Sequence, residues 1–302
     1  MSDSTIRVSA IVISWNGKAF LADCLRTLSA DLEGLSHEII VVDNGSTDGS
    51  VGIINEVCPQ ARLILHHANL GFAKAVNAGI GAARGENLFI LNQDIRVRPG
   101  CTSALLGRLE SDRTIGLIGP RFVGFDGELQ YSARAFPRYR HIIYHALFLD
   151  RLFPKSREFG SWKMTWFDHE TEMEVEQPMG AAMLAPRPVI DRVGLFDESF
   201  PILFNDVDFC RRLHEAGYTL LYYPTAVIEH FVGGSTRRLP IRMVIESHRS
   251  LYRYLRKYAR PREYPLLWFC GALLIAGAIP RLCRAAWQSK KPTAQAPTSV
   301  LR

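Results

Sequence analysis

The sequence lacks most of the features that would assign this 302-residue protein to a class at first sight. Its six cysteines lie far apart and form no C-x-x-C pair, so we interpret them as buried free thiols in a reducing cytoplasm. It contains no low-complexity tract and no repeat of solenoid length. The polar segment Met1–Arg7 predicts no signal peptide. No apolar run reaches the roughly 20 residues of a membrane-spanning helix.

Charge is unevenly distributed along the chain. Residues 1–236 carry 22 Lys and Arg against 28 Asp and Glu, a balance of −6, whereas residues 237–302 carry 14 against 2, a balance of +12. We therefore expect the basic tail to meet an anionic partner, either nucleic acid or phospholipid. An apolar run in the same tail, Pro265–Ile279, favours an anionic membrane surface over nucleic acid. Its basic flanks and length of about 15 residues predict an interfacial or re-entrant anchor. The alternative is a core helix that packs on the body.

The first 115 residues alternate short β-rich runs with helical patterns. The predicted strands are 8–14, 38–42, 62–66 and 87–91, and the predicted helices are 19–32, 51–57 and 72–83. Such alternation predicts βαβ units and a mainly parallel sheet, with its chemistry at the carboxyl ends of the strands.

The pattern is more mixed beyond residue 115. Strands are predicted at 115–123 and 128–134 around a hairpin-like Asp126-Gly127, and at 181–185, 218–223 and 226–231. Helices are predicted at 186–193, 206–216 and 241–259, whereas the aromatic-rich segment 138–176 gives no clear assignment.

Three polar clusters end predicted strands or begin a predicted helix. Asp43 and Asn44 follow the second strand, Asn92-Gln93-Asp94 follows the fourth, and Asn205-Asp206 begins the helix at 206–216. A carboxylate in such places can accept from a ribose hydroxyl, bind a divalent cation between phosphates, or act as a general base. Each cluster taken alone also fits an Asx turn, a turn acid or a helix cap. His230, taken alone, fits a core histidine or a ligand.

The order and spacing of the motifs resemble the family 2 glycosyltransferases, closest to the rhamnosyltransferase-like branch. The motifs of the nucleotide half are Val41–Gly49, Asn69–Phe72, Asn77–Gly79 and Leu91–Asp94. Those of the acceptor half are Met179–Ala182, Val193–Glu198, Asp206–Arg212, Ala216–Tyr218 and Glu229–Ser235. The resemblance implies a GT-A fold over residues 1–236, with a nucleotide-binding half to 115 and an acceptor half at 116–236. Residues 237–302 would form a basic, apolar helical tail.

The resemblance also implies roles for individual residues. Asp206 would be the general base of an inverting transfer, and Asp94 and His230 would bind Mg²⁺ or Mn²⁺. The residues that would bind the nucleotide-sugar donor are Asn16, Asp43, Asn44, Asn69, Lys74 and Asn92. The branch implies dTDP-L-rhamnose or a UDP-sugar as donor, and a lipid-linked saccharide of O-antigen, capsule or cell-wall assembly as acceptor. The enzyme would lie in the cytoplasm, on the inner face of the cell membrane.

Two positions depart from the family pattern. The DXD-like motif begins with Asn92, which leaves one carboxylate there, and Asn205 stands where the family has Glu before Asp206. The second change motivates one alternative, a catalytically silent module that binds nucleotide sugar. A dinucleotide-dependent oxidoreductase is a weaker one, because Gly79–Arg84 lacks the final glycine and does not directly follow a strand. A processive polysaccharide synthase is disfavoured because no Gln-x-x-Arg-Trp motif is present.

Overall fold

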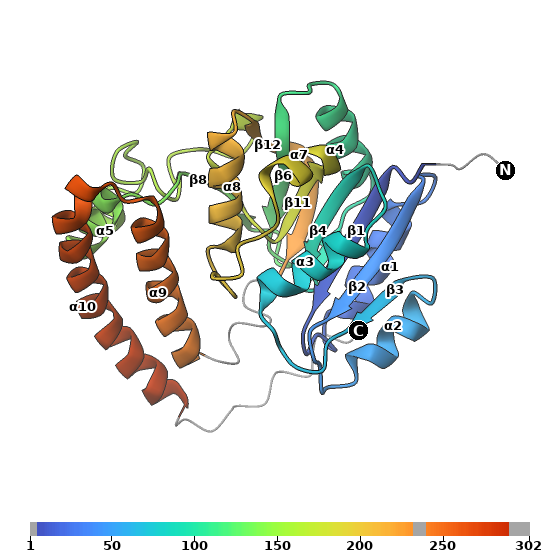
Figure 1. Ribbon diagram of the computed structural model, residues 1–302, viewed down its shortest axis with the longest axis horizontal. Helices are drawn as coiled ribbons and strands as arrows, with labels where there is room; N and C mark the ends of the chain where they lie inside the picture. The colour runs from blue at the N-terminus through green and yellow to red at the C-terminus, as the bar shows by residue number, and fades with distance from the viewer. Residues whose placement is uncertain (1–4, 232–239, 290–302) are drawn as a thin grey trace.

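The computed structural model describes residues 5–231 and 240–289. A central ten-stranded sheet lies between layers of helices (Figure 1), in the order β3-β2-β1-β4-β11-β6-β12-β5, with β7 beside β6 and β9 beside β12. A separate two-stranded sheet joins β8 (Ala133–Arg134) and β10 (Gln177–Pro178).

The first half of the chain forms the parallel part of the sheet. Its elements are β1 (Val8–Ser14), α1 (Leu21–Asp31), β2 (His37–Asp43), α2 (Ser50–Val57), β3 (Arg62–Leu65), α3 (Phe72–Ala82) and β4 (Asn87–Asn92). These match the predicted elements to within two residues at each end. The register pairs Ser14 with Asp43 and Ile13 with Asn92, so the polar residues that follow these strands share one edge of the sheet.

The second half makes the sheet mixed. Its strands are β5 (Ile95–Val97), β6 (Ile115–Val123), β7 (Leu129–Gln130), β9 (Met173–Glu174), β11 (Ala182–Pro186) and β12 (Thr219–His230). Strand β11 runs antiparallel to β4 and β6, whereas β12 runs parallel to β6. The prediction of two strands over 218–231 was wrong, because β12 continues through a register shift between Tyr223 and Val227, around Pro224.

Two apolar clusters pack against opposite faces of the sheet, as the alternation of side chains along β1 requires. Val8, Ala10 and Val12 pack with α1 and α4 (Cys101–Glu110), whereas Ile11 and Ile13 pack with the helices of the other face. Those helices are α3, α5 (Tyr139–Ala146), α7 (Arg187–Val193), α8 (Asn205–Glu215) and the tail; the short α6 (Leu149–Leu152) follows α5. All six cysteines are free, and five are buried as predicted, whereas the prediction was wrong for Cys283, which is exposed on α10 (Tyr264–Ser289).

The C-terminal segment is a helical hairpin that packs on α5 and α8 (Figure 1). It consists of α9 (Pro240–Tyr258), a 3₁₀ turn at Pro261–Glu263 and α10 (Tyr264–Ser289), and it buries Leu251 and Leu267 in the core. The apolar helix is longer than the sequence suggests because it continues through Pro280. Within the described residues, Pro261–Trp287 is the one stretch long and apolar enough to cross a membrane, and only 11% of its most apolar window is buried.

Candidate functional site

A cavity of about 350 Å³ lies where the carboxyl ends of β1 and β4 meet the beginning of α8. Six of the residues predicted from the sequence line it: Asn44, Asn69, Asn92, Asp94, Asp206 and His230. Asp94 and Asp206 are 112 positions apart in the chain, and they reach one space because β11 places the second half of the sheet beside β4.

Two buried polar residues, Asp43 and Asn44, stand at the end of β2, and Asn44 lines this cavity. Asp43 accepts a 2.9 Å hydrogen bond from the Ser46 N–H through Oδ1, whereas its buried Oδ2 has no partner among the described residues. Asn44 donates to Asn69 Oδ1 at 3.1 Å and accepts from the Leu70 N–H at 3.0 Å, which holds the loop before α3. A buried acceptor without a partner is costly, so a donor group that reached Asp43 Oδ2 would be stabilised, although Asp43 does not itself line the cavity.

Asp94, which precedes β5, lies beside His230, the last residue of β12. His230 Nε2 lies 3.7 Å from Asp94 Oδ1, and burial lowers the pKa of His230 to about 4, so its imidazole is neutral at pH 7. Gln130 Nε2 donates to the His230 carbonyl oxygen at 2.7 Å, which places Gln130 Oε1 3.0 Å from His230 Nδ1. Because that oxygen only accepts, Nδ1 carries the proton and the Nε2 lone pair faces Asp94.

These groups fit a divalent cation. Asn92 Oδ1 is buried and has no hydrogen-bond partner among the described residues, and it lines the same cavity as Asp94 and His230. One carboxylate oxygen, one amide oxygen and one neutral imidazole nitrogen suit an ion that completes its shell with phosphate and water. No group of three or more His, Cys, Asp or Glu side chains placed to hold a metal occurs in residues 5–231 and 240–289.

Asp206 reaches the cavity from the first turn of α8. Its Oδ1 accepts from the Val207 N–H at 2.9 Å and its Oδ2 accepts from Gln177 Nε2 at 3.0 Å. Burial raises the pKa of this carboxyl, while the Val207 N–H, the Arg134 charge and the Gln177 amide act in the opposite direction. A Cβ at Gly180 would lie 2.7 Å from Asp206 Oδ2, so glycine keeps the space beside the carboxylate open.

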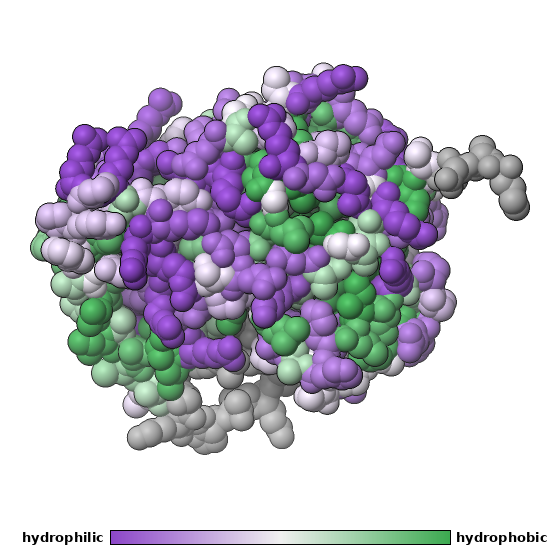
Figure 2. Space-filling model, in the orientation of Figure 1, coloured by the Kyte–Doolittle hydropathy of each residue, from purple (hydrophilic) through white to green (hydrophobic). Residues whose placement is uncertain are grey.

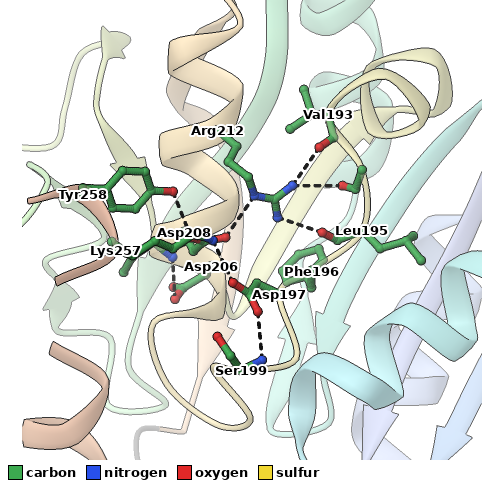
Figure 3. A network of polar contacts seen from close by, with 12 residues as sticks. Val193, Leu195, Phe196, Asp197, Ser199, Asp206, Asp208, Arg212, Lys257 and Tyr258 are labelled. Carbon is green, nitrogen blue, oxygen red and sulfur yellow. Dashed lines mark hydrogen bonds and ion pairs between the residues drawn. The ribbon is translucent and has the colours of Figure 1, made fainter. Parts of the chain in front are cut away.

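The second acid of the same turn has a different environment. Asp208 is fully buried away from the cavity and contacts Arg212, Lys257 and Tyr258 (Figure 3). The structure thus separates two carboxylates that the sequence places side by side. Asp206 is available for chemistry, whereas Asp208 joins α8 to α9.

Asn205 has a structural role that glutamate could not take over. Its Nδ2 donates to the carbonyl oxygens of Phe200 at 3.2 Å and Ile202 at 3.0 Å, which holds the loop that leads into α8. A glutamate has no N–H to donate to these carbonyls. The departure at this position is therefore coupled to the local loop, and Asp206 keeps its place in the cavity.

Three predicted residues do not line the cavity. Asp43 is buried and is absent from its lining. Asn16 accepts from the Thr47 N–H at 2.8 Å and so joins the loops after β1 and β2, and the half-exposed Lys74 lies 3.8 Å from Glu198. Conversely, residues that the sequence interpretation did not select line the cavity, among them Trp15, Gln93, Met179, Arg242 and Met243.

Two of these missed residues belong to different parts of the structure. Gln93 Oε1 accepts from the Ser14 hydroxyl and the Trp15 N–H, each at 2.9 Å, which fixes the loop after β1; its position inside the Asn92–Asp94 motif was the available signal. Arg242 comes from α9, in the segment predicted to be a separate tail, and nothing in its local sequence indicates that it reaches the cavity.

The sheet order and the cavity at the strand ends define the fold of a nucleotide-diphospho-sugar transferase, GT-A. The solved structure of a mannosyltransferase from Pyrobaculum calidifontis in complex with GDP-Man and Mn²⁺ has a TM-score of 0.57 at 19% identity, over 96% of this chain and 77% of that one. The Staphylococcus aureus TarS fragment 1–349 gives a TM-score of 0.54 at 13% identity, over 95% and 93%.

Sequence comparison gives the family. The model described as glycosyl transferase family 2 matches residues 9–170. The N-acetylglucosaminyl-diphospho-decaprenol L-rhamnosyltransferase of Mycobacterium tuberculosis is 30% identical over 242 residues, which cover 76% of this chain and 78% of that protein. The pre-mycofactocin glycosyltransferase of the same organism is 31% identical, over 73% and 46%. The chain belongs to family 2 of the glycosyltransferases, in its rhamnosyltransferase-like branch, and it is a glycosyltransferase enzyme.

Proposed function

We propose that this enzyme transfers L-rhamnose from dTDP-L-rhamnose to a saccharide linked to a lipid, with inversion at the anomeric carbon. The observation that carries the proposal is that Asp94 and Asp206 line one cavity at the strand ends. Similarity to a rhamnosyltransferase whose name specifies a diphospho-lipid acceptor supports the sugar and the acceptor class. A UDP-sugar is the second donor candidate.

Each of these residues has a separate role in a single nucleophilic displacement at the anomeric carbon. The end of β2, with Asp43 and Asn44, would contact the nucleoside, and Asn92, Asp94 and His230 would hold the divalent cation. When bound, the cation supplies positive charge that stabilises the leaving diphosphate. The acceptor hydroxyl oxygen forms the new bond to the anomeric carbon, and the bond from that carbon to the diphosphate oxygen breaks. The hydroxyl proton passes to Asp206, and nucleoside diphosphate leaves with the electron pair of the broken bond.

A panel of nucleotide sugars with Mn²⁺ tests the donor. We expect dTDP-L-rhamnose to give the largest increase in Tm, because a ligand that binds only the folded state stabilises it. Release of nucleoside diphosphate, measured with and without acceptor, separates an enzyme from a silent binding module. If no donor is turned over in the presence of a lipid-linked acceptor, the proposal fails.

Asp94→Asn should remove the Mn²⁺-dependent part of the donor's thermal shift. Asparagine keeps the shape of the side chain but lacks the negative charge that attracts the cation, so we expect the apparent donor affinity to fall at least tenfold and transfer to become undetectable. The exposed Asp126→Asn is the matched control and should behave as wild type. A full Mn²⁺-dependent shift in Asp94→Asn would show that the cation binds elsewhere.

We propose that the α9–α10 hairpin holds the enzyme on the cytoplasmic face of the cell membrane. Apolar side chains gather over α10 at the lower left of Figure 2, and Trp268 and Phe269 are 66% and 53% exposed. The double variant Trp268→Ser, Phe269→Ser should bind vesicles that contain phosphatidylserine about tenfold or more weakly, because it loses the apolar area that the two rings would bury in the membrane. Leu65→Ser, at a 54% exposed residue on β3, is the control. If the double variant and the Leu65→Ser control co-sediment with vesicles equally well, α10 is not the membrane anchor.

A further inference from the structure

A second cavity, of about 370 Å³, lies between α5, α9 and α10. It shares Leu203 and Asp206 with the first cavity, so the proposed base lines both spaces. Neither the family comparison nor the sequence interpretation assigns anything to this space. The residues that line it come from segments far apart in the sequence: residues 134–177, the start of α8, and both tail helices.

The two cavities differ in charge. Among the described residues that line the first, Asp94 and Asp206 are acidic and Arg242 is the one cation. Those that line the second include Arg134, Lys163 and Arg281, and their only carboxylate is the shared Asp206. The first cavity therefore suits a cation-bound diphosphate, whereas the second suits an anion that binds without a metal.

The three cations of the second cavity are available for a ligand. None of their side chains makes a hydrogen bond or ion pair with any residue in the described ranges, although the charge of Arg134 lies close enough to Asp206 to oppose the burial that raises the pKa of that carboxyl. Arg138 and Arg140, from the same stretch of chain as Arg134, are by contrast paired with glutamates. Burial lowers the pKa of Arg134, because it disfavours the charged guanidinium. A bound anion would offset this desolvation cost by pairing with the charge.

Apolar side chains form much of the remaining wall, beside His145, Gln177, Ser247 and His248, and they lead toward the exposed face of α10. Ile142, Trp162 and Leu274 line the cavity, and the next residue on α10, Ile275, is 68% exposed. A ligand with an anionic group among the three cations could therefore continue along an apolar helix face. A lipid diphosphate has this combination of charge and hydrocarbon.

We propose that the second cavity is the acceptor subsite, in which Arg134, Lys163 and Arg281 hold the diphosphate of a lipid-linked saccharide. This inference rests on the proposed function, because it assumes a lipid-linked acceptor. The sugar hydroxyl then reaches Asp206 from the α5 and α10 side while the donor occupies the cavity beside Asp94. The tail hairpin is thus part of the acceptor site as well as a membrane contact.

Lys163→Ala and Arg281→Ala test the subsite. The probe is N-acetylglucosamine linked through a diphosphate to a short prenyl chain, and its comparator is an alkyl N-acetylglucosaminide without phosphate. Each variant should raise KM for the diphosphate probe about tenfold, because a charge-assisted hydrogen bond is lost, and change KM for the comparator little. Arg284→Ala is the matched control, since Arg284 is exposed on the same helix and lines neither cavity.

Calorimetric titration of the diphosphate probe into the enzyme without donor separates this inference from the proposed function. Weaker binding to Arg281→Ala than to Arg284→Ala supports the subsite even if no donor is turned over. Equal binding to these two variants, in an enzyme that transfers sugar normally, overturns the subsite and leaves the proposed function standing. Inorganic pyrophosphate that binds as tightly as the lipid probe would contradict a lipid-linked occupant.

Discussion

Asp206→Asn should lower kcat for sugar transfer by about 10²–10⁴-fold while donor binding persists. Removal of a general base costs a factor of this size, and asparagine cannot take the proton of the attacking hydroxyl. Asp206 is not among the residues proposed to bind the cation, so the Mn²⁺-dependent thermal shift with donor should remain. Tm should not fall greatly, because burial raises the pKa of Asp206, which means that the fold disfavours its charge.

The pH dependence of the transfer rate tests the role of Asp206 as the base in a second way. A general base acts when deprotonated, so the rate should rise with pH through a pKa that lies above the ordinary aspartate value of 3.8. Gln177→Met removes a hydrogen bond that favours the ionised form of Asp206, so it should raise the pKa of this carboxyl. The rise of the transfer rate with pH should therefore occur at higher pH than in the wild type. Asp191→Asn, at an exposed acid on α7 that lines neither cavity, serves as control. A wild-type kcat in Asp206→Asn would show that Asp206 is not the general base.

The nucleotide half could be predicted from the sequence because its signals are local. Each strand from Val8 to Asn92 is a short apolar run that ends in a turn, and βαβ units bring such ends to one edge. The prediction failed where an element is very short or gains its pairing from a distant partner. Strand β5 has three residues and pairs with β12, more than 130 positions later, so its sequence alone carries little signal.

The second cavity was beyond prediction for a different reason. Arg134, Lys163 and Arg281 are separated by 29 and 118 positions, and none belongs to a recognisable motif. They share a space only because α10 folds back along α9 and packs on α5, an arrangement set by buried side chains such as Leu251 and Leu267. Packing between distant helices depends on the shapes of both surfaces, which hydrophobic periodicity does not specify.

Asp208→Ala should destabilise the protein by roughly 2–4 kcal/mol, because it leaves the partly buried Arg212 without its carboxylate partner and leaves Lys257 paired with Asp197 alone. The carboxylate is fully buried, and it lies 2.5 Å from Lys257 Nζ and 2.9 Å from Arg212 Nε (Figure 3). The hydroxyl of Tyr258 also donates to it, at 2.9 Å. Arg212 in turn donates to the carbonyl oxygens of Val193 at 2.8 Å and Leu195 at 2.7 Å. One side chain therefore ties α8 to α9 and to the loop after α7.

Thermal unfolding measures this loss, and we expect Tm to fall by roughly 5–15 °C. Glu215→Ala is the matched control: it breaks the exposed pair of Arg211 and Glu215 on the same helix, which should cost less than about 0.5 kcal/mol. Because α9 carries Leu251 and His248 to the second cavity and Arg242 and Met243 to the first, Asp208→Ala should also raise KM for both the lipid-linked acceptor and the donor. An unchanged Tm would show that the α8–α9 contact does not depend on this carboxylate, and unchanged KM values in a variant with a lowered Tm would show that substrate binding does not depend on this contact.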